Sequence, residues 1–345
     1  MVATIALIDG AIASHRGDET AVLGHFQLVD DAIGRRGFED EDLEYRQFLV
    51  DRGLLQRSPR SEIEHSCSQL PGTLTAVLAF EVEKYPASSN LEERNVDVII
   101  CRDREKVGEV AAQYVAAGVE GKDLPVLGFA TGSSPLGLYE ALARRVADGS
   151  LKLSHARGFA LDEYVGIPLE HPESYHAVIR RTVVEPLGLD PALVRVPDGL
   201  AEDVDAAAAR YDADIVAAGG IDVQILGIGA NGHIGFNEPF TSFGSITHKV
   251  ALTERTRSDN ARFFDSLEQV PTHAVSQGLA TIMRSRRAVL VASGSCKAEA
   301  IAAMIEGPVA ARCPASLLQF HPDVVVVVDE AAAEQLQHRE HFRTV

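Results

Sequence analysis

From Val96 to the carboxyl end, short apolar segments rich in β-branched residues alternate with longer alanine-rich segments, and this alternation constrains the fold more than any other feature. Nearly unbroken apolar strands that alternate with helices are typical of a parallel sheet covered on both faces. The expected strands are Val96–Cys101, Pro125–Ala130, Ala156–Leu161, Val223–Gly227, Ala288–Ala292 and Val324–Val328. The expected helices are Glu105–Ala117, Leu136–Asp148, Val204–Ala218, Cys296–Ile305 and Ala331–Gln337. We therefore predict an α/β fold with a doubly wound, mostly parallel, Rossmann-like sheet.

The first 95 residues differ in texture from the rest of the chain. They are acidic and irregular, with loops expected at Arg57–Ser61 and Pro86–Asn90 and only scattered helical patterning. We therefore divide the chain into an N-terminal extension, residues 1–95, and an α/β domain, residues 96–345. The extension is either a poorly packed accessory segment or a regulatory or partner-binding domain, and the sequence does not decide between them.

The charge balance argues against nucleic acid as a partner. The 345 residues include 50 acidic and 32 basic side chains, which gives a net charge of −18. Such a chain repels a phosphate backbone unless it carries a local basic patch. The nearest cluster, Arg284, Arg286 and Arg287, is interpreted as a solvated helix end. A small anionic substrate is still compatible with this charge, because salt screens charges that lie more than about 10 Å away.

Neither the cysteines nor the hydropathy indicate a metal site or a membrane segment. The four cysteines form no CxxC pair and have no histidines at a zinc-site spacing: Cys67, Cys101, Cys296 and Cys313. We expect reduced thiols in a cytoplasmic protein. Met1–Ala13 is apolar but short, carries Asp9 and lacks a basic start, so it does not resemble a signal peptide. No apolar run reaches the roughly 18 residues of a membrane helix, so no membrane partner is expected.

A turn of small residues joins the second expected strand to its helix. Thr131, Gly132 and Ser133 let a ligand approach the backbone closely. Ser134 is suited to cap the helix, and Pro135 to occupy its first position. The N–H groups of such a helix start form an anion site that fits a phosphate. The alternative is that Gly and Ser serve only the chemistry of the turn.

Two carboxylates, Asp162 and Glu163, directly follow the third expected strand. Ligands of open α/β sheets bind at the carboxyl ends of the strands. A carboxylate at that place can act as a general base if partial burial tunes its pKa. The alternative for Asp162 is a loop residue that caps the next element.

Ile225–Pro239 is the segment richest in chemical groups. Its glycines imply tight backbone geometry around Asn231, His233 and Glu238. A histidine flanked by an orienting amide and a carboxylate has the parts of an acid–base catalyst. Gly227–Gly232 resembles a dinucleotide fingerprint, but no helix is expected directly after it, so we predict no nucleotide cofactor. The other alternative for His233 is a structural core histidine.

Two cations are candidates for a phosphate clamp. Arg262 lies in a helical stretch inside a long polar connection. Lys297 lies at a helix start, within a turn of glycine and serine that follows the fifth expected strand. A lysine in such a turn is the better candidate, because other phosphate-binding turns have this composition. The alternative for each residue is an ordinary surface charge.

Taken together, seven segments resemble the glucosamine-6-phosphate deaminase family in order and spacing. The resemblance extends from about Val96 to the carboxyl end, and residues 1–95 have no counterpart in it. The matching segments are Ala130–Pro135, Leu161–Gly166, Glu170–Tyr175, Gly229–Pro239, Thr256–Phe264, Gly294–Lys297 and Leu317–Pro322.

The resemblance implies hydrolytic deamination and aldose–ketose isomerisation of glucosamine 6-phosphate to fructose 6-phosphate and ammonia. It implies that Asp162 moves the C2 proton and that His233 assists ring opening, held by Asn231 and Glu238. The family varies between Asp and Asn at position 231. A lid is implied at Leu252–Thr272. The residues implied to hold the phosphate are Thr131, Gly132, Ser133, Arg262 and Lys297.

The resemblance implies neither a metal nor a redox cofactor. The only partner it implies is a small-molecule sugar phosphate, and a homo-oligomer is compatible with it. The rival readings are a 6-phosphogluconolactonase-like enzyme, another sugar-phosphate isomerase, and a sugar-phosphate-sensing transcription regulator. A lactonase is not expected to carry both Leu161–Tyr164 and Phe236–Pro239. A regulator would bind DNA through residues 1–95, but these carry 17 acidic and 9 basic side chains, net −8.

Overall fold

The structure, a computed structural model, describes residues 96–345. The predictions made for residues 1–95, including their loops, lie outside the described residues. The described residues, 96–345, belong to one compact unit. Within the described part, no helix is long and apolar enough to cross a membrane.

The main sheet has eight strands, and every neighbouring pair in it is parallel, as predicted. Six of its strands are those expected from the sequence: β1 (Asp97–Cys101), β2 (Val126–Phe129), β3 (Arg157–Ala160), β6 (Val223–Leu226), β9 (Arg287–Ala292) and β10 (Val324–Asp329). The two further strands, β5 (Val194–Arg195) and β11 (Arg343–Thr344), lie at the edges. The strand order is β11-β1-β10-β9-β6-β2-β3-β5. Each edge strand is only two residues long, which is too short to show a periodicity, so the sequence did not predict these strands.

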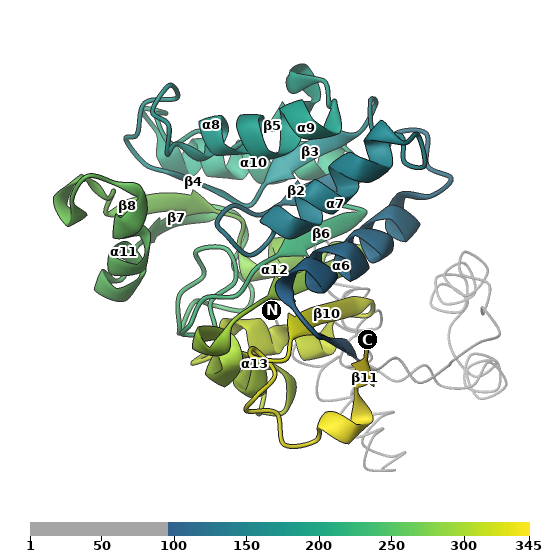
Figure 1. Cartoon of the computed structure of the whole chain (residues 1–345). Coiled ribbons are helices and arrows are strands. Elements are labelled where there is room, and N and C mark those ends of the chain that lie inside the picture. Colours follow the sequence, from purple (N-terminus) through teal and green to yellow (C-terminus); the bar gives the residue numbers. More distant parts are fainter. Residues whose placement is uncertain (1–95) are drawn as a thin grey trace, which may run out of the picture. The chain divides into compact units, whose positions relative to one another are not determined.

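Helices cover both faces of this sheet (Figure 1). On one face, α6 (Arg104–Val119) and α7 (Leu136–Ala147) bury their apolar sides in the main core. On the other face, Tyr211 and Ile215 of α10 (Val204–Ala217) pack against Val126 and Phe159. The shorter helices are α8 (Tyr175–Ile179), α9 (Glu185–Leu187), α11 (Glu254–Asn260), α12 (Leu279–Met283) and α13 (Ala298–Ile305).

The helix expected at Ala331–Gln337 is wrong, because this segment forms turns. The N–H groups of Gln337 and His338 donate to the carboxylate of Glu306, at 2.8–3.0 Å. In a helix these N–H groups would donate to carbonyl oxygens four residues earlier. Because they donate to Glu306 instead, the segment does not form a helix. This contact spans 31 residues and leaves no local trace in the sequence.

Two helix starts also differ from expectation. Helix α7 begins at Leu136 with Pro135 as its N-cap, and no side-chain hydrogen bond caps it, so the capping role expected for Ser134 is wrong. The expected helix Cys296–Ile305 is split into a 3₁₀ turn, Ser295–Lys297, and α13.

A second, antiparallel sheet of three strands lies to one side of the main sheet (Figure 1). Its order is β4 (Asp162–Tyr164), β8 (His273–Ser276), β7 (His248–Ala251). A small core of its own, separate from the main core, supports it and consists of Tyr164, Ile167, Phe236, Leu252 and Ala274. Asp162 therefore lies in a strand and not in a loop.

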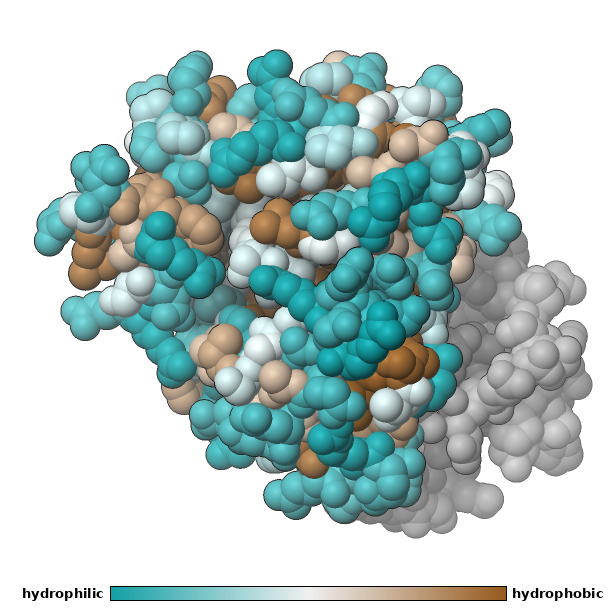
Figure 2. All heavy atoms as spheres, in the orientation of Figure 1, coloured by the Kyte–Doolittle hydropathy of each residue, from teal (hydrophilic) through white to brown (hydrophobic). Residues whose placement is uncertain are grey.

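The surface is mostly hydrophilic on the face drawn in Figure 2. The basic cluster noted in the sequence is neutralised by carboxylates. Arg284 pairs with Asp212 at 3.1 Å, and Arg286 pairs with Asp222 at 3.0 Å. Arg287 pairs with a third carboxylate, so the cluster is a set of ion pairs rather than a freely solvated helix end.

Candidate active site

Four segments of the candidate site follow four adjacent strands. The strands β9, β6, β2 and β3 are neighbours in the main sheet. Because parallel strands end at the same edge, the segments that follow them lie side by side. These segments contain Lys297, His233, Thr131 and Asp162. The sheet order therefore gathers residues that are up to 166 positions apart in the sequence.

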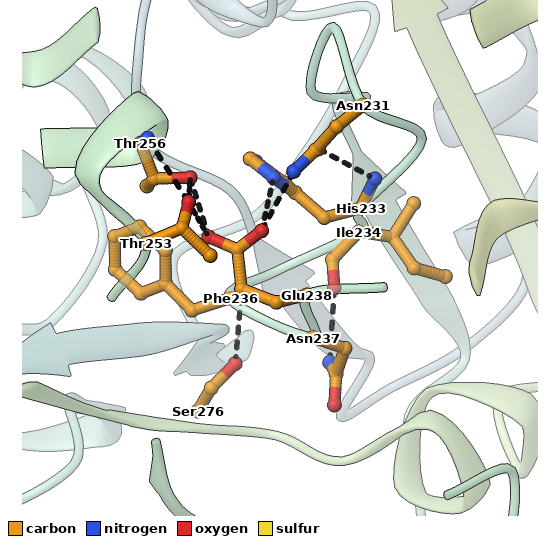
Figure 3. Close-up of polar contacts among 9 residues, drawn as sticks. All are labelled: Asn231, His233, Ile234, Phe236, Asn237, Glu238, Thr253, Thr256 and Ser276. Atoms are coloured by element: carbon orange, nitrogen blue, oxygen red, sulfur yellow. Dashed lines mark hydrogen bonds and ion pairs between the residues drawn. The ribbon is translucent and has the colours of Figure 1, made fainter. Parts of the chain in front are cut away.

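Glu238 is the centre of the polar contacts in the loop after β6 (Figure 3). Its Oε2 accepts a hydrogen bond from Asn231 Nδ2 at 2.7 Å and lies 3.6 Å from His233 Nδ1. Its Oε1 accepts from the hydroxyls of Thr253, at 3.1 Å, and Thr256. Burial by itself would raise the pKa of Glu238, but His233, Thr256 and Asn231 together lower it to about 2. The carboxylate is thus ionised and is contacted by four side chains.

The imidazole of His233 has its place because the loop carries glycines. A Cβ on Gly229 would lie 2.3 Å from His233 Cε1, so any side chain there would displace the ring. The backbone N–H of His233 donates to Asn231 Oδ1 at 3.3 Å. Asn231 therefore contacts both His233 and Glu238. Its Oδ1 accepts from the His233 backbone, and its Nδ2 donates to the Glu238 carboxylate. At 3.6 Å, His233 Nδ1 and Glu238 Oε2 are too far apart for a hydrogen bond, but they are close enough for an ion pair whenever the imidazole is protonated.

Asp162 lies beside this loop. It pairs with Ser276 of β8, and the Ser276 hydroxyl accepts the backbone N–H of Phe236 at 3.0 Å. Gly235 has a φ of +55°, and a Cβ there would lie 3.7 Å from Asp162 Oδ2. The carboxyl group is buried, with only 5% of the residue exposed. Burial and the nearby charge of Glu163 raise the pKa of Asp162 well above its usual value.

The second carboxylate of the pair, Glu163, has a structural task. It accepts the backbone N–H groups of Tyr164, Tyr175 and His176 at 2.8–2.9 Å. The pKa of Glu163 is raised, because burial outweighs the lowering by these three N–H groups. The Glu163 carboxylate thus anchors the start of α8.

The residues expected to hold a phosphate lie in three separate segments of the chain. Thr131 shares a side-chain hydrogen bond with Tyr175, and Gly132 has a φ of +84°, which suits glycine. A Cβ on Gly227 would lie 3.5 Å from Ser134 Cβ, so the turn that includes Ser133 borders the His233 loop.

Lys297 is partly buried, and burial lowers its pKa. The charges of Asp259, Arg262 and Arg255 act on it as well, which places the segment around α11 next to it. Arg262 itself lies in the 3₁₀ turn Ala261–Phe263, inside the expected lid.

Sequence reasoning missed the residues that hold the others in place. Thr253 and Thr256 were not foreseen as partners of Glu238, although Thr256 opens one of the seven matching segments. Asn260 and Tyr164 share a hydrogen bond at 3.0 Å that joins α11 to β4, and it too was unforeseen. Hydroxyl and amide groups of this kind are common in loops, so only their partners reveal their role.

Comparison with known proteins shows the family of the chain. The family described as glucosamine-6-phosphate isomerases/6-phosphogluconolactonase matches residues 102–327. The chain belongs to this family. A family member from Cutibacterium acnes named glucosamine-6-phosphate deaminase is 55% identical over 248 residues, which cover 72% of this chain and 95% of that protein.

Two solved structures are similar to this chain to different degrees. A monomeric glucosamine-6-phosphate deaminase is 40% identical with a TM-score of 0.68, covering 70% of this chain and 100% of that one. A 6-phosphogluconolactonase from Trypanosoma cruzi is 18% identical with a TM-score of 0.56, covering 71% and 98%. The lactonase likeness shows the shared fold alone. The predicted fold class and family resemblance are thereby confirmed.

Proposed function

We propose that this chain converts glucosamine 6-phosphate and water into fructose 6-phosphate and ammonia. The observation that carries the proposal is that Asp162, the loop with His233 and Glu238, and the turn at Thr131 follow three adjacent strands at the carboxyl edge of the sheet. A base, an acid–base histidine and an anion site are what proton transfer on a sugar phosphate needs. Relatives at 55% and 40% identity that bear the deaminase name support the same reaction.

His233 acts first, in ring opening. The imidazole takes the proton of the C1 hydroxyl and returns a proton to the ring oxygen, which leaves an open aldehyde. The ionised Glu238 stabilises the imidazolium while it exists, because an adjacent opposite charge favours the charged form. Asn231 keeps the loop and Glu238 in register during this exchange.

Asp162 then moves the proton from C2 to C1. Removal of the C2 proton, with one proton of the substrate ammonium passing to O1, gives an enolamine, and return of the C2 proton to C1 gives the iminium of fructose 6-phosphate. Water adds to the C2=N bond, and the nitrogen leaves as ammonia. A carboxylate with a raised pKa is a stronger base than a solvated one, so the burial of Asp162 favours this step. None of these steps calls for a metal or redox cofactor.

An assay for ammonia release tests the proposal directly. Purified protein with glucosamine 6-phosphate should release ammonia and form fructose 6-phosphate in equal amounts. The lactonase alternative is tested in the same experiment with 6-phosphogluconolactone, whose hydrolysis should not exceed the uncatalysed rate. Lactone hydrolysis without ammonia release would contradict the proposal.

Lys297→Ala should weaken binding of glucosamine 6-phosphate about ten-fold or more. Charge-assisted bonds to phosphate contribute roughly 1.5–3 kcal/mol each. Non-phosphorylated glucosamine should stay an equally poor substrate, because it lacks the group that Lys297 contacts. The measurement is KM for both sugars, with Lys152→Ala, an exposed lysine, as the control. Equal losses for both sugars would place Lys297 away from the phosphate.

Residues 96–345 should carry the chemistry by themselves. The family match lies within residues 102–327, and so does every residue assigned a role above. A fragment that begins near Glu92 should therefore fold and release ammonia at a rate close to that of the full chain. Circular dichroism and the ammonia assay check this. An insoluble or inactive fragment beside an active full chain would show that residues 1–95 are required.

The predicted homo-oligomer stays a prediction. The solved relative at 40% identity is described as monomeric and gives it no support. The cytoplasmic location and the absence of a nucleic-acid partner likewise rest on the cysteines and the charge balance of the sequence.

A further inference from the structure

Asp329 ends strand β10 at the same edge of the sheet as the candidate site. It is buried, with 9% of the residue exposed, and it has no part in the proton transfers proposed above. One of the two neighbours of β10 in the sheet is β9, whose last residue, Ala292, pairs with Val328. Two residues after Ala292 comes Gly294, the first residue of the turn that carries Lys297.

The carboxylate of Asp329 binds this turn through its backbone. The N–H of Gly294 donates to both carboxylate oxygens, at 3.0 and 3.1 Å. A second N–H, that of Ala332, donates to Oδ1 at 2.8 Å. The turn continues with a hydrogen bond from Lys297 N to the Gly294 carbonyl oxygen at 3.0 Å. Gly294 thus links Asp329 to Lys297 through two consecutive hydrogen bonds.

The backbone of this turn needs such a restraint. Gly294 has φ +91° and ψ 151°, a conformation that only glycine adopts readily. Glycine also has many other conformations available, so something must select this one. A hydrogen bond from the Gly294 N–H to a carboxylate is strong enough to do so. The Asp329 carboxylate accepts backbone N–H groups at both oxygens, and Gly294 donates to each of them, so its contacts hold the turn.

We propose that Asp329 is a positioning residue for phosphate binding, which holds the Gly294–Lys297 turn so that the Lys297 ammonium faces the substrate phosphate. This inference rests on the proposed function, because it takes Lys297 as a phosphate ligand. It predicts that substitution of Asp329 weakens substrate binding and leaves kcat almost unchanged.

The test is a graded series measured on the full chain. Asp329→Ala removes both hydrogen bonds and should raise KM for glucosamine 6-phosphate about ten-fold, with kcat within about three-fold of the unchanged chain. Asp329→Asn keeps one oxygen for both N–H groups but places an amide against Gly294 N, so KM should rise only about three-fold. The control is Asp323→Asn at the other end of β10, whose carboxylate pairs with Arg287 and should not affect affinity.

Inorganic phosphate provides a readout that needs no turnover. Its dissociation constant, measured by thermal shift, should rise by the same factors as KM. In a Lys297→Ala background, Asp329→Ala should add less than about three-fold, because the residue through which it acts is gone. If Asp329→Ala does not fold, the Asn variant and its cycle with Lys297→Ala decide the matter.

Three results would overturn the inference. The first is a fall in kcat of Asp329→Ala with KM unchanged. The second is a double variant whose loss of phosphate affinity equals the product of the losses in the two single variants. The third is unaltered phosphate binding in Lys297→Ala. Failure of the proposed function is distinguishable from these, because it shows as absent ammonia release in the unchanged chain. Phosphate binding would still report on Asp329 in that case.

Discussion

Asp162→Asn should lower kcat for ammonia release by roughly 10²–10⁴-fold, the usual contribution of a general base. Asparagine has nearly the shape of aspartate but no basic oxygen, so KM should stay within about three-fold. With substrate deuterated at C2, the isotope effect on kcat should grow, because removal of the C2 proton becomes the slow step. A variant that deaminates at a near-normal rate would show that another group is the base.

The same substitution should stabilise the protein at neutral pH. Burial and Glu163 raise the pKa of Asp162 in the folded chain. A group with a raised folded pKa contributes stability below its unfolded pKa, near 3.8, and this contribution is lost as pH rises through the folded pKa. Asparagine cannot ionise, so the Asp162→Asn chain avoids this loss of stability as the pH rises. Thermal melts should give a higher Tm for Asp162→Asn, which excludes unfolding as the cause of lost activity.

The neighbouring carboxylate offers a matched control. Glu163→Gln removes a charge one residue away, but Glu163 anchors α8 through three N–H groups. This variant should lose thermal stability and keep kcat within about ten-fold. The two variants should therefore change activity and stability in opposite ways. If both variants lose turnover to the same degree, the assignment of proton transfer to Asp162 and of a structural role to Glu163 is wrong.

Glu238→Gln should lower kcat by roughly 10²-fold through loss of the charge that supports His233. Glutamine must also direct an amide toward either Asn231 or the two threonine hydroxyls, and Asn231 can only donate there. The C2 isotope effect should shrink in this variant, because ring opening becomes the slow step. An isotope effect that grows, as in Asp162→Asn, would place Glu238 in the C2 proton transfer instead.

Glu238 also sets a pH dependence of opposite sign to that of Asp162. Its folded pKa of about 2 lies below the usual 4.5, so it contributes stability above pH 4.5 that is lost as pH falls toward 2. The unchanged chain should lose stability across this window more steeply than Glu238→Gln does. Thermal melts between pH 2 and 5 measure the difference. Parallel curves would mean that the carboxylate is not held in its ionised form.

The sequence alone determined the sheet and the place of the site. Strands such as Val324–Asp329 are buried at every position, so their apolar runs are visible without any partner. The carboxyl ends of parallel strands share one edge, and Asp162, His233 and Lys297 follow three such ends. Their presence at the same edge was therefore predictable, while their catalytic roles remain predictions.

Only the tertiary structure decided which polar groups hold the others. The sheet β4-β8-β7 pairs Asp162 with Ser276, 114 residues later, and β7 alternates in burial too briefly to be recognised. The structural role of Glu163 is recognised from the three backbone N–H groups that it accepts, and the role proposed for Asp329 from the N–H of Gly294. A hydrogen bond between distant segments depends on where the packed chain places both partners. An apolar run, in contrast, indicates its own burial because the hydrophobic effect needs no specific partner.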